Sequence, residues 1–290
     1  MINERMLQRL GGVATVHQLR STGASAEELT AAVRGGVLRR IRKGIYAEPS
    51  APRDVLAAVA ARGRLSCVSA ARTYGLWAGS DGRMHLQFAP HERAGPASAH
   101  VRHWLPTEAG AEVWRVTVAD CLRSVARCAD EETAIAVFDT AISAGLTNVL
   151  DLHRILVGQP AKARSRGALA RPGSDSGVES IVRQRLERAG HIVEQQVHVV
   201  GVGRVDMRVD GVLYLEIDGF AFHHDREQFE RDRARDAILA ARGLKRLRVS
   251  AAQVLGEWEV VAEHVRRVLS HSANSQQQWD QPDGVVCSIY

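Results

Sequence analysis

The chain has 290 residues, of which 45% are hydrophobic and 24% charged, a composition typical of a soluble globular protein with two or three domains. The first ten residues carry charges where a signal peptide would be apolar, and no uncharged apolar run approaches about 18 residues, so we expect neither a secretory leader nor a membrane span. The formal net charge of +5 favours polyanionic partners such as DNA.

Cysteine usage predicts a reduced, cytoplasmic protein without structural zinc. The four cysteines form no CxxC pair and have no histidine at zinc-finger spacing. Cys121 and Cys128 lie seven residues apart in a helical pattern and are expected to be small core residues.

Residues 1–50 predict three short helices followed by a basic β-hairpin. Thr15–Gln18 and Ser25–Glu28 both have the capping-box form, in which side chains satisfy the free amides of a first helical turn. The third helix is expected to end at Gly35–Gly36, and Gly44 to form a turn or bulge in the hairpin. Three helices and a basic ribbon are the order of a winged helix, in which one helix enters the major groove and the ribbon touches the DNA backbone or minor groove.

Five basic residues of this block are candidate DNA contacts: Arg34, Arg39, Arg40, Arg42 and Lys43. The alternative is a solvated charged face without a ligand. The candidate recognition helix carries Glu27 and Glu28 with only one arginine, which is a poor set for reading bases. Capping and the helix dipole are enough to explain both glutamates. The pattern therefore favours phosphate contact through the ribbon and gives no sign of sequence-specific readout.

The hairpin segment Leu38–Tyr46, LRRIRKGIY, resembles the N-terminal domain of AbiEi-type antitoxins. The resemblance covers about the first 50 residues and continues more loosely through residues 66–77 and 118–130. It implies a DNA-binding winged helix, often one that represses its own operon. A cognate toxin or antitoxin and a second copy of the chain are the protein partners left open.

Residues 51–157 predict an α/β scaffold or interaction module. Helical patterns at 54–62, 67–77, 118–129, 131–144 and 148–157 surround expected strands near 83–89, 99–104 and 113–117. The histidines of this block fit no metal template, so no metal site is expected among them: His85, His91, His100 and His103. Residues 158–176 are expected to form a basic linker, in which ARSRGALA could be a short helix, and residues 270–290 a loose tail.

Residues 177–269 contain the chemistry-bearing motif. The predicted order is a helix at 177–189, strands at 192–199, 203–209 and 212–218, a helix at 225–242, a strand at 244–249 and a helix at 251–269. An Asp210–Gly211 turn folds two strands together, which brings Asp206 toward Glu216 and Asp218 on one face. Crowded carboxylates of this kind usually hold a divalent cation or share protons.

The αβββαβα order and its motifs resemble the PD-(D/E)xK nuclease superfamily, and more closely the very-short-patch repair (Vsr) endonucleases and their relatives. The matching pieces are Val178–Ser180, Arg204–Asp206, Glu216–Gly219, Phe222–His223, and the run Glu230–Arg233 leading to Gly243–Leu247. The whole chain is thus predicted to be a multidomain α/β protein with a winged helix at 1–50, a middle module at 51–157 and a restriction-endonuclease-like domain at 177–269.

This second resemblance implies the roles of five residues. Asp206 and Glu216 match the metal-binding acids, and Glu179 matches a helix-borne acid that binds metal through water. His223 matches an active-site histidine of the Vsr enzymes. Asp218 stands where most members have a lysine and Vsr has a histidine, so the identity of the general base stays open.

Two functions follow from these resemblances. In the first, the protein is a Mg²⁺- or Mn²⁺-dependent DNA endonuclease that a winged helix delivers to DNA, in phage defence, a toxin–antitoxin system or DNA repair. In the second, it is an AbiEi-type DNA-binding regulator whose nuclease fold is inactive. RNA as the substrate is a third alternative.

Overall fold

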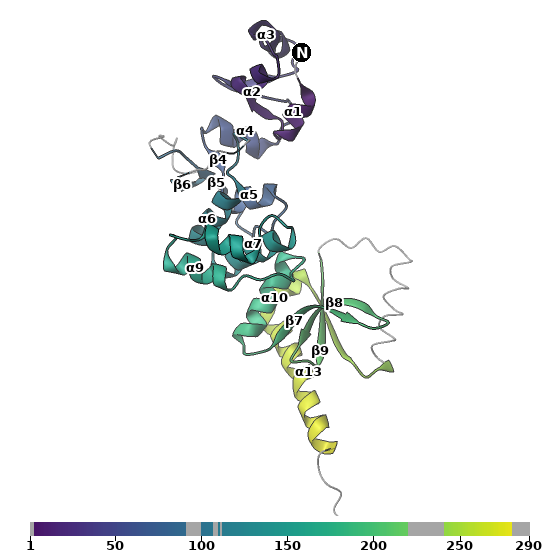
Figure 1. The fold of residues 1–290 in the computed structure, drawn as a ribbon. Helices are drawn as coiled ribbons and strands as arrows, with labels where there is room; N and C mark the ends of the chain where they lie inside the picture. The colour runs from purple at the N-terminus through teal and green to yellow at the C-terminus, as the bar shows by residue number, and fades with distance from the viewer. Residues whose placement is uncertain (1–2, 91–99, 107–109, 111, 220–240, 280–290) are drawn as a thin grey trace, which may run out of the picture. The chain divides into compact units, whose positions relative to one another are not determined.

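The computed structural model describes residues 3–90, 100–106, 110, 112–219 and 241–279 (Figure 1). The chain divides into two compact units, Met1–Pro172 and Gly173–Tyr290. Each unit is described by itself below. The predicted mixture of helices and sheets in a multidomain α/β protein is confirmed.

The first unit begins with a winged helix. Its elements are α1 (Glu4–Arg9), β1 (Val13–Thr15), α2 (Val16–Ser21), α3 (Ala26–Arg34), β2 (Arg39–Arg42) and β3 (Ile45–Ala47). Both capping boxes form as expected, and α3 ends with Gly35 as its C-cap. The short strand β1 is absent from the sequence prediction, and it pairs with β3 to give the sheet order β1-β3-β2. A small core of apolar side chains, including Leu7, Leu19, Leu29 and Leu38, holds the helices against this sheet.

The rest of the first unit is an α/β module whose helices and short strands pack around two clusters of buried apolar side chains. It contains α4 (Arg53–Ala60), β4 (Arg64–Leu65), α5 (Cys67–Thr73), β5 (Met84–Gln87), β6 (His100–His103), α6 (Val118–Cys128), α7 (Glu131–Ser143), α8 (Val149–Ile155) and α9 (Ala161–Ala168). The three strands have the order β4-β5-β6, and β5 and β6 are parallel. Leu122 and Val125 of α6 are fully buried, with Phe138 of α7 in the same core.

Two expectations for this module are wrong in part. Residues 113–117 do not form a strand and make only an isolated bridge between Leu65 and Arg115. Residues 158–176 are not simply a linker, because α9 forms at the ARSRGALA segment and packs on the core through Ala163 and Arg166. The buried Arg166 donates a hydrogen bond from its guanidinium to the carbonyl oxygen of Ala126 at 2.8 Å. That contact compensates part of the cost of burying a basic side chain in this core.

The structure bears on two expectations for the cysteines and histidines of this module. Cys121 is buried as predicted, but Cys128 is exposed rather than part of the core. The fold also brings His85 and His103 together with Cys67 and Cys128, although no metal template is visible in the sequence.

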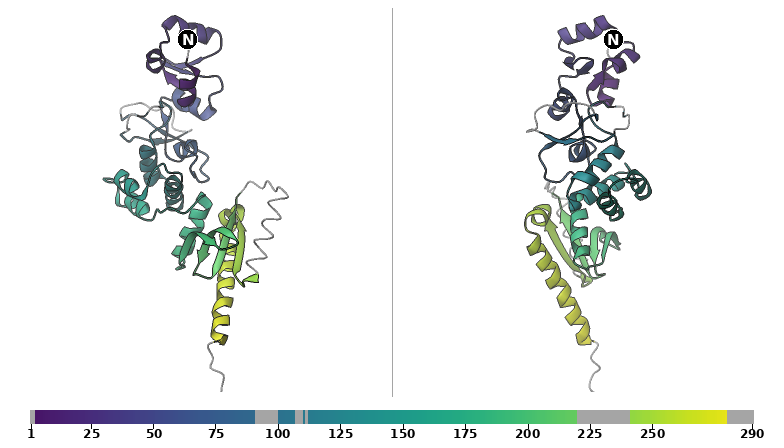
Figure 2. Two further views of the ribbon diagram at one scale, coloured as in Figure 1. Left: turned by 45° about the vertical axis from the view of Figure 1, so that its right-hand side comes forward. Right: turned by 90° about the vertical axis from the view of Figure 1, so that its left-hand side faces the viewer.

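The second unit is a mixed sheet with helices, in the order expected of the C-terminal block. Its elements are α10 (Gly177–Arg188), β7 (Val193–Val199), β8 (Gly203–Val209), β9 (Leu213–Asp218), β10 (Lys245–Ser250), α12 (Ala251–Gly256) and α13 (Trp258–Trp279). Figure 1 labels α10, β7, β8, β9 and α13, and the long helix α13 is drawn in yellow there and in Figure 2. The sheet order is β10-β9-β8-β7, with β10 parallel to β9 and the other pairs antiparallel. Asp210 and Gly211 both have positive φ, at 51° and 70°, as a tight primed hairpin turn requires.

The C-terminal boundaries differ from the sequence expectation. The predicted single helix at 251–269 is two helices, and α13 continues to Trp279, so residues 270–279 are helical rather than part of a loose tail. The predicted helix at 225–242 lies almost wholly outside the described residues. Among the helices that the structure describes, none has the length and apolarity needed to cross a bilayer.

Packing at the core of the first unit can be tested with two leucines. Leu122 is fully buried in α6, whereas Leu150 in α8 is 59% exposed. We expect Leu122→Ala to lower the free energy of unfolding by about 2–5 kcal/mol, because it leaves a cavity in a close-packed region. Leu150→Ala should change it by less than about 0.5 kcal/mol. Urea unfolding of both variants followed by circular dichroism measures the difference, and equal effects would contradict the assigned core.

Candidate functional site: a basic wing and a carboxylate cluster

The winged helix presents its third helix with one face open to solvent. Leu29 of α3 is buried, while Glu27, Thr30, Ala31 and Arg34 lie on the exposed side at helical spacing. Glu28 is engaged in the capping box, where its side chain accepts a hydrogen bond from the backbone amide of Ser25 at 3.0 Å. One of the two glutamates is therefore explained by capping, and the open face carries a single acid.

The wing itself is basic and exposed. Its four candidate DNA contacts all have exposed side chains: Arg39, Arg40, Arg42 and Lys43. Arg34, at the end of α3, is exposed as well. Gly44 has a φ of 81° and lies in the turn of the hairpin, one of the two forms predicted for it. The pairing of β2 with β3 is irregular between Arg40 and Arg42, a position that the sequence did not single out. Irregularities of this kind commonly increase the local twist of a strand.

Two further arginines near the wing escape the sequence analysis. Arg42 lines a cavity of about 360 Å³ together with Arg62 and Arg64, which come from the loop after α4 and from β4. Arg62 has a φ of 62°, a left-handed conformation that is unusual for a side chain of its size. A sequence search for basic runs could not find this group, because it joins residues about twenty positions apart.

The second unit brings two of the predicted acids, Asp206 and Glu216, close to each other. Met207 of β8 pairs with Leu215 of β9, so the preceding Asp206 and the following Glu216 occupy facing positions. One Asp206 oxygen accepts a hydrogen bond from the backbone amide of Ile217 at 2.8 Å. Burial raises the pKa of Asp206, and the negative charge of Glu216 raises it further, although the Ile217 amide acts in the opposite direction.

Glu216 is held by two arginines of the neighbouring strand. Arg246 and Arg248 of β10 both donate to the same Glu216 oxygen, Arg248 at 2.9 Å. Burial acts to raise the pKa of Glu216, but these two guanidinium groups outweigh it, so that the pKa is lowered. Arg248 also lies 3.6 Å from Asp218, which places Glu216 and Asp218 on one face as predicted.

Glu179 completes the cluster from the first turn of α10. Its carboxylate is buried and accepts hydrogen bonds from the Asp175 amide at 2.9 Å and from the Gln196 side chain at 3.0 Å. Burial raises the pKa of Glu179 to about 7, and the charge of Asp206 contributes to the shift. A carboxyl group with this pKa can give up or accept a proton near neutral pH.

Gln196 is a residue that the sequence does not single out. It lies in β7 with a φ of 53°, which breaks the regular pairing of that strand with β8 beside the cluster. Strained backbone of this kind is frequent at functional sites. The sequence around Gln196 contains no pattern that predicts a left-handed conformation, so sequence analysis could not find this residue.

The fit of a magnesium ion to this cluster is partial. Asp206 and Glu216 supply the hard oxygen ligands that Mg²⁺ prefers, but Glu216 is already neutralised by two guanidinium groups. Within the described ranges, the one group of three or more His, Cys, Asp or Glu ligand atoms close enough to share a metal lies in the first unit, not here. The candidate histidine, His223, lies outside the described residues.

The protonation of Glu179 predicts a pH effect on stability. Because its folded pKa lies above its ordinary value of 4.5, at about 7, the stability it contributes is full below pH 4.5 and is lost as the pH rises through 7. The linked change is up to about 3 kcal/mol. We expect Glu179→Gln to reduce the fall in unfolding free energy between pH 5 and pH 8, as measured by urea unfolding.

Glu194→Gln serves as the control for this measurement. Arg208 lowers the pKa of the exposed Glu194, which therefore titrates below the window used. Its replacement should leave the pH dependence between pH 5 and pH 8 as in the wild type. If Glu179→Gln behaves in the same way, Glu179 does not take up a proton on folding.

Comparisons with known proteins bear on the N-terminal domain. No curated protein matches the chain. A solved structure, the RV2827C protein from Mycobacterium tuberculosis, is similar at 19% identity over 57% of this chain and 73% of that one, but its TM-score of 0.30 carries no conclusion about fold or function. Residues 4–49 match the family model described as a transcriptional regulator, the AbiEi antitoxin. The winged helix is thus the part of the chain for which a family match exists.

Proposed function

We propose that this protein is a DNA-binding transcriptional regulator of the AbiEi type, which contacts duplex DNA through its N-terminal winged helix. The observation that carries the proposal is the exposed wing, where three arginines and a lysine lie within five positions of one hairpin. Guanidinium and ammonium groups in such a ribbon are suited to phosphate oxygens on the DNA backbone. The family match over residues 4–49 supports the same function.

The open face of α3 is suited to a modest direct readout in the major groove. Arg34 can donate two hydrogen bonds to a guanine, and the methyl groups of Thr30 and Ala31 can contact thymine. Glu27 would repel the backbone unless it accepts a hydrogen bond from a cytosine amino group. A cognate toxin and a second copy of the chain are the protein partners that a regulator of this type would have.

Removal of the wing charges tests the proposal. Replacing Arg39, Arg40, Arg42 and Lys43 together by alanine should weaken duplex binding at least tenfold at moderate salt. It should also reduce the slope of log K against log salt by roughly 1 for each DNA phosphate that the wing no longer neutralises. Fluorescence anisotropy with a labelled duplex over a salt series measures both quantities.

A matched control has the same composition of charges elsewhere in the first unit. Its four side chains are exposed on α6, α8 and α9: Arg127, Arg154, Lys162 and Arg164. The quadruple alanine variant changes the net charge equally, so it should keep most of the affinity and slope if the wing is the contact surface. Equal losses in the two variants would show a general charge effect and contradict the role of the wing.

A second candidate function is metal-dependent hydrolysis of phosphodiester bonds in the C-terminal unit. It is favoured by the electrostatic interaction of Asp206 with both Glu179 and Glu216, three acids that come from three different elements. Mg²⁺ or Mn²⁺ bound there would polarise the scissile phosphate and acidify a water molecule. Buried acids with raised pKa values are costly to keep unless they serve such a purpose.

The remaining steps, orientation of the ligands and proton transfer, would depend on residues of the chain itself. The Ile217 amide orients the Asp206 carboxylate, and Glu179 can take a proton from the attacking water or return one to the leaving oxygen. Arg246 and Arg248 are placed to contact a phosphate, but in their present ion pairs they occupy Glu216. Those ion pairs favour the regulator with an inactive nuclease fold over the endonuclease.

Plasmid cleavage distinguishes the two candidates. If the second unit is an active nuclease, the wild type nicks or linearises supercoiled plasmid with Mg²⁺ or Mn²⁺, and Asp206→Asn lowers the rate at least a hundredfold. Glu194→Gln, an exposed acid of the same sheet, should retain full activity. If the wild type cleaves no DNA or RNA substrate over a range of metals, the endonuclease is excluded and only the regulator function remains.

A further inference from the structure

A group of metal-ligand side chains lies in the first unit, apart from both the wing and the carboxylate cluster. One ligand atom from each of Cys67, His85, His103 and Cys128 lies within 4.8 Å of all the others. The residues come from four elements, α5, β5, β6 and α6, and are separated by at least 17 other residues in the chain. We propose that these four side chains bind one zinc ion as a tetrahedral Cys₂His₂ site.

The distances between ligand atoms are suited to zinc. His85 Nδ1 lies 3.2 Å from His103 Nε2 and 3.8 Å from Cys128 Sγ. A tetrahedral ion with bonds of about 2.0–2.3 Å holds its ligand atoms about 3.3–3.8 Å apart, so these separations are close to the edges of such a tetrahedron. Two imidazoles and two thiolates with closed coordination are typical of structural zinc.

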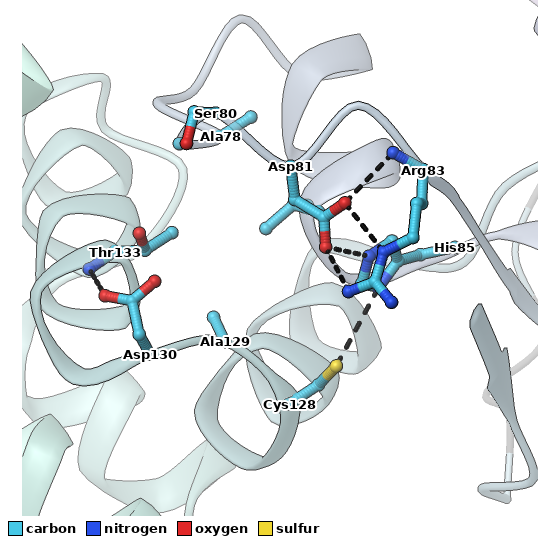
Figure 3. A pocket seen from close by; sticks show the side chains of 11 residues that line it. Ala78, Ser80, Asp81, Arg83, His85, Cys128, Ala129, Asp130 and Thr133 are labelled. Carbon is cyan, nitrogen blue, oxygen red and sulfur yellow. Dashed lines mark hydrogen bonds and ion pairs between the residues drawn. The ribbon is translucent and has the colours of Figure 1, made fainter.

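The position of the ring proton of His85 favours a cation between the four side chains. Its Nε2 lies 3.1 Å from a carboxylate oxygen of Asp81, which is also bound to Arg83, as Figure 3 shows. A carboxylate accepts hydrogen bonds, so Nε2 carries a ring proton, and in the neutral ring Nδ1 then presents a lone pair toward His103 and Cys128. The contact between His85 and Cys128 is drawn in Figure 3. An aspartate that orients a histidine in this way is the usual outer partner of a zinc ligand.

The backbone is built to place these side chains together. In the parallel pairing of β5 with β6, His85 faces Val101 and Gln87 faces His103, so the two histidines project from the same face of the sheet. The backbone amide of Ser66 donates to the carbonyl oxygen of His85 at 2.9 Å, which fixes the start of α5 beside β5. Cys67 follows with a φ of 50°, a strained conformation that aims its buried side chain into the group.

The site would tie the module together and remain reachable from solvent. Cys67 and His85 are buried, His103 is half-buried and Cys128 is exposed at the end of α6. Beside His85 and Cys128 lies a cavity of about 290 Å³, lined also by Asp81 and Thr133. A zinc ion held by all four side chains joins two helices to two strands and has no open position for a substrate, so its role is structural.

Metal analysis of the full-length chain tests the proposal. Protein purified without chelators should contain about one zinc per chain by mass spectrometry of the metal. After the zinc is removed, the protein should bind one added Co²⁺ ion per chain. The bound cobalt should give the strong visible absorption of a tetrahedral ion with thiolate ligands. Removal of zinc from the wild type should lower Tm by roughly 5–10 °C.

Variants separate the site from other cysteines and histidines. Cys128→Ser should reduce bound zinc or cobalt at least tenfold, and circular dichroism checks that it is folded. Cys121→Ser and His100→Gln are the controls, since Cys121 is a buried cysteine outside the group and His100 lies on the other face of β6. Both control variants should bind one equivalent of zinc or cobalt.

Three results would overturn the proposal. The first is wild-type protein that neither contains zinc nor takes up Co²⁺ with the tetrahedral spectrum. The second is undiminished metal binding by folded Cys128→Ser. The third is a native disulfide between Cys67 and Cys128, detected by mass spectrometry of alkylated protein, because oxidation would remove both thiolate ligands.

Discussion

The free energy required to bury charged and polar groups is the constraint on which both units of this protein depend. Glu216 can lie inside the C-terminal sheet because two arginines of β10 meet its carboxylate. Arg166 can lie inside the helical core of the first unit because the carbonyl oxygen of Ala126 accepts a hydrogen bond from its guanidinium. Each of these contacts joins segments 30 or more residues apart, so satisfying a buried group also fixes which elements become neighbours.

The same constraint explains the two clusters of functional side chains. In the second unit, Glu179 and Asp206 approach one another with fewer compensating charges than Glu216 has, and burial shifts their pKa values upward. In the first unit, the ring nitrogens of His85 and His103 face one another at 3.2 Å beside a thiol. Protons would relieve the repulsion between the acids in the first case, and the proposed zinc ion would relieve that between the ligand atoms in the second.

The proposed activities therefore belong to separate parts of the chain. DNA contact depends on the exposed wing and α3, and zinc on the module that follows them. Hydrolysis, if present, depends on the acids of the C-terminal sheet. The Glu216 carboxylate cannot pair with two guanidinium groups and also be a full ligand of Mg²⁺. The two arginines therefore decide whether this sheet is better suited to bind a metal ion or to bind a phosphate without hydrolysing it.

Local features of the fold were determined by the sequence alone. The capping boxes at Thr15 and Ser25 and the primed turn at Asp210–Gly211 involve residues close together in the chain, so their chemistry can be read without a structure. The strand order around Asp206 and Glu216 follows from the same turn. The N-terminal family match likewise rests on a continuous run, residues 4–49.

Only the tertiary structure decided the contacts between distant segments. The ion pairs of Glu216 with Arg246 and Arg248 depend on the parallel pairing of β9 with β10, which no local pattern specifies. Cys67, His85, His103 and Cys128 have no regular spacing, since they converge through a parallel strand pair and two helix ends. A sequence records neighbours along the chain, whereas a metal site or a buried ion pair depends on distance in space, and for these residues the two are unrelated.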